Sequence, residues 1–137
     1  MRTPSARSFT FLAAASAVAA SVLALAGPAS ADVSVQGVDT YASTLDGEAE
    51  ARWWHDGDKL VVHDVLADGW GSRAQLQTWN SALNQWMTAF TCTDSNSSDG
   101  TKTCSQNLVE GTPVRIHLWQ YKGTSTRLHT YSPQGQA

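Results

Sequence analysis

Short alternating segments of apolar and polar residues dominate the chain after Ala31, and this pattern limits the fold more than any other feature. Helical periodicity is hard to find in this part of the sequence. Gly, Asn, Asp and Ser interrupt the alternation about every ten residues, which is typical of sandwiches and barrels. We therefore predict an all-β fold, an antiparallel β-sandwich of about seven or eight short strands.

The clearest unit is a hairpin from Glu48 to Leu66, in which two alternating stretches flank Asp56 and Gly57. This dipeptide accepts the positive φ angles of a type I′ turn. The register then pairs His55 with Asp58, Trp54 with Lys59, Trp53 with Leu60, Arg52 with Val61, Ala51 with Val62 and Glu50 with His63.

Each face of this hairpin follows from the register. The core face is predicted to carry Ala49, Ala51, Trp53, Leu60 and Val62. The wetter face is predicted to carry Glu50, Arg52, Trp54, Lys59 and His63. Asp64 falls on the core side, so either the pairing ends there or its carboxylate caps a nearby loop.

Further strands are predicted at Ser72–Trp79, Gln85–Thr93, Val114–Tyr121 and Thr126–Tyr131. In the third of these, the core face is predicted to carry Val114, Ile116 and Leu118. Its outer face is predicted to carry Arg115, His117, Trp119 and Tyr121. The last strand follows a turn around Gly123. An odd loop there places Leu128 in the core and adds Arg127, His129 and Tyr131 to the outer face, whereas an even loop reverses this.

The first 31 residues are interpreted as an export signal, because Arg2 and Arg7 precede an apolar run that ends near Ala31. A transmembrane anchor is the competing interpretation, but the small residues before Ala31 favour cleavage. Residues 32–45 then form an N-terminal extension or edge strand, 46–132 the β-sandwich domain, and 133–137 a frayed tail. We expect a secreted protein without membrane association after processing.

Cleavage would leave seven basic and twelve acidic residues, a net charge of −5, since Arg2 and Arg7 are removed. Such a surface repels phosphate backbones, so nucleic acid is not an expected partner. Cys92 and Cys104 lie in the exported part and are expected to form a disulfide. It would pin the base of a mobile polar loop, Asp94 to Thr103, to a strand that starts near Cys104.

The outer face of the Val114–Tyr121 strand is the best candidate site, because Trp, Tyr and Arg are favoured in protein-interface hot spots. Its candidate residues are Arg115, His117, Trp119, Tyr121, Arg127 and His129. An ordinary exposed face is the alternative. His117 and His129 lack a third ligand, so neither a metal site nor a cofactor is predicted.

The chain has six tryptophans. Of these, Trp54, Trp70, Trp79 and Trp119 are expected to show a face to solvent, where they could stack on sugar rings. No nucleophile with its base and no metal motif is present. Glu48 and Glu50 share a strand face beside Arg52 and His63, where ion pairing accounts for them. We therefore expect a protein that is not an enzyme.

Several segments carry a resemblance to known proteins: WHDGD at 54–58, FTCTD at 90–94, VRIHLWQY at 114–121 and LHTY at 128–131. They resemble small secreted actinobacterial β-sandwich proteins over nearly all of the predicted mature chain. The chain is also similar to the small adaptor subunit of secreted umbrella toxin particles. In that family the adaptor joins a lectin-bearing subunit to the toxin stalk, and its N-terminal extension docks into a partner. The resemblance implies an interaction module.

Three functional hypotheses remain open. In the first, an interaction module adds the segment containing Val33, Val35 and Val38 as a strand to a partner's sheet. In the second, a carbohydrate or cell-wall binding domain uses Trp54, Trp70 or Trp119. In the third, a secreted inhibitor of a hydrolase presents the loop from Asp94 to Thr103.

Overall fold

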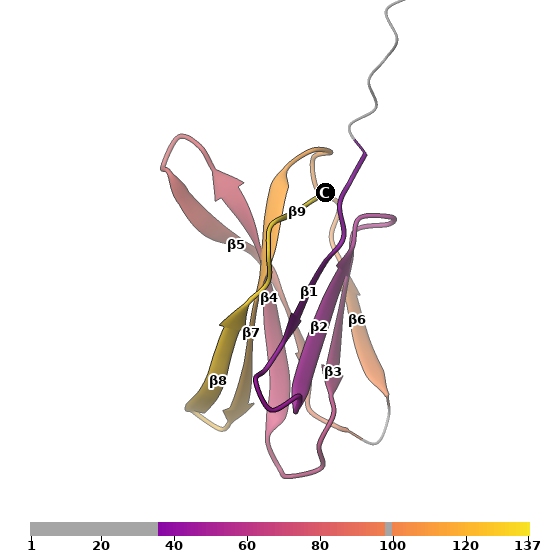
Figure 1. Ribbon diagram of the computed structural model, residues 1–137, viewed down its shortest axis with the longest axis vertical. Coiled ribbons are helices and arrows are strands. Elements are labelled where there is room, and N and C mark those ends of the chain that lie inside the picture. The colour runs from indigo at the N-terminus through magenta and orange to yellow at the C-terminus, as the bar shows by residue number, and fades with distance from the viewer. Residues whose placement is uncertain (1–35, 98–99) are drawn as a thin grey trace, which may run out of the picture. The chain divides into compact units, whose positions relative to one another are not determined.

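The computed structural model describes residues 36–97 and 100–137, and these residues form nine strands and no helix (Figure 1). The predicted export segment, Val33 and Val35 lie outside the described residues. The strands are β1 (Thr40–Ser43), β2 (Ala49–Trp54), β3 (Lys59–Asp64), β4 (Gly71–Asn80), β5 (Gln85–Asp94), β6 (Thr101–Ser105), β7 (Pro113–Lys122), β8 (Ser125–Tyr131) and β9 (Gly135–Gln136).

Two antiparallel sheets pack against each other, which confirms the predicted sandwich (Figure 1). The four-stranded sheet has the order β1-β2-β3-β6. The five-stranded sheet has the order β5-β4-β7-β8, with β9 paired to β7 as well. No helix among the described residues is long and apolar enough to cross a membrane.

The predicted register of the β2–β3 hairpin is confirmed from Glu50–His63 to Trp54–Lys59. The predicted type of turn is wrong. The residues with positive φ are Gly57 and Asp58, whereas a type I′ turn would place them at Asp56 and Gly57. The Asp58 amide donates to the His55 carbonyl at 3.3 Å, so the loop closes as a four-residue turn that keeps the same pairing.

Buried side chains from both sheets fill the space between them. The predicted core face of the hairpin is confirmed, because Trp53, Leu60 and Val62 are fully buried. The predicted core face of β7 is confirmed as well, with Val114, Ile116 and Leu118 fully buried. Alternation in these strands therefore identifies the core side, because successive side chains of a strand point to opposite faces.

The predicted disulfide between Cys92 and Cys104 is present, with an S–S distance of 2.01 Å. It joins β5 to β6, the edge strands of different sheets, and so closes one side of the sandwich. Cys104 lies near the end of β6 and not at its start. The loop is therefore shorter than predicted, because Asp94 still belongs to β5 and Thr101 already belongs to β6.

The C-terminal residues close the other side of the sandwich, so the prediction of a frayed tail is wrong. Gln136 exchanges two backbone hydrogen bonds with Val38, at 3.0 and 2.9 Å, and Ala137 is buried. Gly135 permits this approach, because a Cβ there would lie 2.5 Å from the Val38 carbonyl oxygen. Val38 precedes β1. Residues 32–45 were predicted to form either an extension or an edge strand, and the strand is found at residues 40–43.

The last hairpin combines an even loop with a bulge. Lys122 pairs with Ser125, which leaves a two-residue loop, and Arg127 pairs with Gln120 on the core side. The register then shifts between Leu118 and Gln120, where Leu128 has a φ of +56°. Two residues of β8 thus lie opposite one residue of β7. The bulge returns Tyr131 to the outer face opposite His117.

Asp64 is the last residue of β3, so the first of the two predicted alternatives holds and the pairing ends there. It pairs with Ala49, and its carboxylate accepts a hydrogen bond from the Ser72 hydroxyl in the other sheet at 3.2 Å. Its backbone amide donates to the Asp94 carboxylate at 2.9 Å. Burial raises the pKa of Asp64, and the charges of Asp94 and Asp68 raise it further against the Ser72 hydrogen bond.

Candidate functional site

The outer face of the five-stranded sheet carries a continuous set of aromatic and basic side chains, which we name the outer strip. Cross-strand pairing places them next to one another, because outward positions of neighbouring strands are in register. The outer strip consists of Arg73, Trp79, Trp86, Arg115, His117, Trp119, Tyr121, His129 and Tyr131. The described outward positions of these strands include no Asp or Glu.

Arg115 lies between two rings in the middle of the outer strip. Its guanidinium carbon is 4.6 Å from the centroid of Trp86 and 4.6 Å from that of Tyr131. The Arg115 Nε donates to the Gln77 side chain at 2.8 Å. A cation held between two ring faces is pre-oriented, so less side-chain entropy is lost when a partner binds it.

His117 and His129 form a second group in the outer strip. The Nε2 of His117 lies 3.0 Å from the Nδ1 of His129, so the two rings share one hydrogen bond. The His117 ring also stacks on Tyr131, with centroids 4.3 Å apart and planes inclined by 10°. Burial lowers the pKa of His117, and the charges of His129 and Arg115 lower it further.

Trp119 was expected to show a face to solvent, and this prediction is wrong. Its exposed fraction is only 8%. His129 stacks over the Trp119 ring at 5.8 Å, and His117 packs beside it at 4.7 Å. Among the Trp and Tyr rings of the outer strip, that of Tyr131 is instead the most exposed, with an exposed fraction of 52%. Trp119 therefore supports the surface, and Tyr131 offers a contact.

Tyr121 ends the outer strip, with the guanidinium carbon of Arg73 4.1 Å from its ring centroid. Trp79 and Trp86 meet edge to face at the opposite end, at 5.4 Å. The predicted residues Arg115, His117, Tyr121 and His129 are thus brought together on one face. Arg73 and Trp86, which the prediction did not include, extend this face. Tyr131, which the sequence placed on this face only for an odd loop, extends it as well.

Arg127 does not belong to the outer strip, which corrects the predicted site. Its Nη2 lies 2.7 Å from the Glu48 carboxylate and 2.6 Å from the Asp68 carboxylate. Its Nε donates to the Gln120 side chain at 2.7 Å. The pairing of Arg127 with Gln120 on the core side causes this difference. Arg127 thus connects β8 to residues that flank the four-stranded sheet.

Of the valine segment, only Val38 is described, and it lies apart from the outer strip. Its side chain is exposed, while its backbone is already paired with Gln136. Strand addition by this segment therefore has to use backbone groups other than those of Val38 that pair with Gln136.

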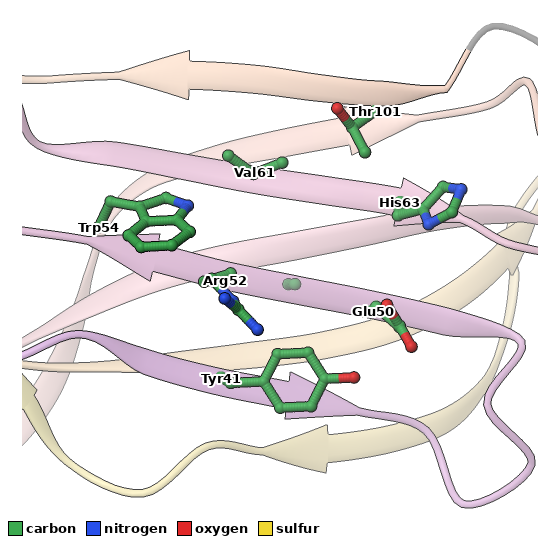
Figure 2. A pocket seen from close by; sticks show the side chains of 8 residues that line it. Tyr41, Glu50, Arg52, Trp54, Val61, His63 and Thr101 are labelled. Atoms are coloured by element: carbon green, nitrogen blue, oxygen red, sulfur yellow. The ribbon is translucent and has the colours of Figure 1, made fainter.

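The outer face of the four-stranded sheet carries a separate shallow hollow of about 240 Å³, shown in Figure 2. The Arg52 guanidinium carbon lies 5.5 Å from the ring centroid of Tyr41 and 5.0 Å from that of Trp54. Glu50 and His63 lie opposite each other at one end of the hollow. Trp54 is exposed as predicted.

The predicted ion pairing of Glu48 and Glu50 with Arg52 and His63 is wrong. Glu48 pairs with Arg127. Within residues 36–97 and 100–137, Glu50 makes no ion pair, because the Arg52 guanidinium is held between the two rings. The hairpin register had already placed Glu50, Arg52, Trp54 and His63 on one face. Tyr41 was missed, because the segment before residue 45 showed no clear strand pattern.

Asp94 is buried at the end of β5. Its two carboxylate oxygens accept hydrogen bonds from the backbone amides of Asp64 and Asn96. Residues 98 and 99 of the following loop lie outside the described residues. In the described part of the chain, no three His, Cys, Asp or Glu side chains are grouped so as to hold a metal ion.

Comparison of the chain with protein-family models, with curated proteins and with solved structures found no match.

Proposed function

We propose that this chain is a secreted, non-enzymatic interaction module that binds an acidic protein surface through the outer strip. The observation that carries the proposal is the outward stack in which Arg115 lies between Trp86 and Tyr131, beside the His117–His129 pair. Aromatic and Arg side chains held in this way are the usual anchors of interface hot spots.

The charge of the outer strip supports an acidic partner. The whole chain has a net charge of −3, yet the outer strip contains Arg73 and Arg115 and no carboxylate among its outward positions. A basic face on an acidic protein orients it toward an acidic surface and speeds association. Binding should therefore weaken as salt concentration rises, because the Debye length shortens.

A narrower proposal is that the module is an adaptor within a secreted toxin complex. It is supported by the sequence resemblance described above. An adaptor needs two binding surfaces, and the outer strip would provide one of them. The segment that precedes Val38 would provide the other by adding a strand to a partner's sheet.

Affinity purification of the tagged protein from the culture fluid of its host tests the proposal. A stoichiometric protein partner is expected, and Tyr131→Ala or Arg115→Gln should abolish its capture. Tyr41→Ala is the matched control, because it removes an exposed ring from the opposite sheet. Absence of any partner, or equal capture by the Tyr131 and Tyr41 variants, would refute the proposal.

A further inference from the structure

We propose that the hollow on the four-stranded sheet is a second binding site, and that it takes a neutral polysaccharide chain. This inference is independent of the protein partner, because none of its residues belongs to the outer strip. It rests on Tyr41, Arg52 and Trp54, together with Glu50 and His63 (Figure 2).

The two exposed aromatic rings of the hollow favour a sugar as its ligand. Tyr41 and Trp54 each have an exposed fraction of 40%, and the Arg52 guanidinium separates them. The rings are therefore spaced along the face and do not cover each other. Sugars present flat C–H faces that pack on aromatic rings, and two spaced rings offer platforms for successive units of one chain.

Polar side chains that make no hydrogen bond to another described residue also favour a sugar as the ligand of this hollow. Glu50 of β2 lies directly opposite His63 of β3, and Thr101 of β6 lies opposite His63. In the part of the chain that the structure describes, the side chains of Glu50, Arg52 and His63 make no hydrogen bond to another residue. Carboxylate acceptors and guanidinium donors beside an aromatic ring match the hydroxyl groups of a sugar.

The charge and the shape of the hollow limit the class of ligand that it can bind. The hollow contains one carboxylate, Glu50, and one guanidinium, Arg52, so it has no excess of positive charge for a polyanion. It is shallow, and smaller than the roughly 300–1,000 Å³ of sites that enclose a small molecule. Two further hollows adjoin it, one sharing Tyr41 and Arg52 and the other sharing Trp54 and Val61. This row of hollows suits an extended chain that lies across the sheet.

The test is an array that carries neutral and anionic oligosaccharides, probed with the protein purified from culture fluid. Neutral glycans should be retained, and titration calorimetry with the best of them should give a measurable affinity. Trp54→Ala should weaken that affinity about tenfold. Arg52→Gln should weaken it as well, because the guanidinium donors are lost.

Controls separate this site from the outer strip. Tyr131→Ala should leave glycan affinity unchanged, and thermal unfolding of each variant should show that it is folded. Retention of no neutral glycan, or retention only of anionic ones, would overturn the proposal. Unchanged affinity in folded Trp54→Ala and Arg52→Gln variants would also overturn it. Each of these results would leave the protein-partner proposal standing, since that depends on Tyr131 and Arg115.

Discussion

Replacing Arg127 with alanine tests whether this residue holds the sandwich together. In the native fold its Nε is bonded to Gln120, whose side chain is fully buried, and its Nη2 is bonded to Glu48 and Asp68. Alanine leaves the buried Gln120 oxygen without a partner, which costs about 1–3 kcal/mol. Each partly exposed ion pair adds about 0.2–1 kcal/mol.

The total loss in the free energy of unfolding is therefore about 1.4–5 kcal/mol. For a domain of this size, each kcal/mol lost lowers the Tm by about 4–8 °C. Urea denaturation and differential scanning calorimetry measure both quantities. Arg115→Ala is the matched control, since that arginine lies on the outer strip, and its loss should cost about 1 kcal/mol or less. Equal losses in the two variants would refute the structural role of Arg127.

Three further predictions concern stability. Replacing Cys92 and Cys104 with serine should lower the free energy of unfolding by about 3 kcal/mol, because the short closed loop gains freedom in the unfolded chain, and urea denaturation measures this. The lowered pKa of His117 means that the folded state binds fewer protons than the unfolded state, so the Tm should fall as the pH drops below 6.5. His117→Gln should flatten that fall, and an unchanged slope would contradict it. Because the pKa of Asp64 is raised in the folded state, its ionised form opposes folding at neutral pH. Asp64→Asn should therefore raise the Tm at pH 7. This gain in Tm should disappear as the pH falls through the folded pKa toward 3.8, because the wild-type carboxyl then becomes protonated. A lower Tm at pH 7 would contradict that reasoning.

Alternation and turn chemistry predicted much of the fold. The dipeptide Asp56-Gly57 located the hairpin, and its register followed even though the turn type was wrong. The strict alternation of Val114–Tyr121 identified both faces of β7. These predictions succeeded because a side-chain period of two leaves only one register that buries the apolar face.

The features of the fold that the sequence did not predict depend on contacts between residues far apart in the chain. The bulge at Leu128, which has a positive φ, shifts the alternation of the side chains that follow it in β8. Arg127 therefore points to the core side of the sheet, whereas His129 points to the outer face. Strand β9 has only two residues, which are too few to show a periodicity in the sequence. It forms because its backbone pairs with Val38 and with β7. The burial of Trp119 arises from the His129 ring of a neighbouring strand.

Hydroxyl-radical footprinting of the captured complex tests the central claim most directly. We expect oxidation of Tyr131 and Trp86 to fall on binding of the protein partner, because both rings flank Arg115 in the outer strip. Oxidation of Trp54, on the opposite sheet, should stay unchanged. Protection of Trp54 with no change at Tyr131 would contradict the claim.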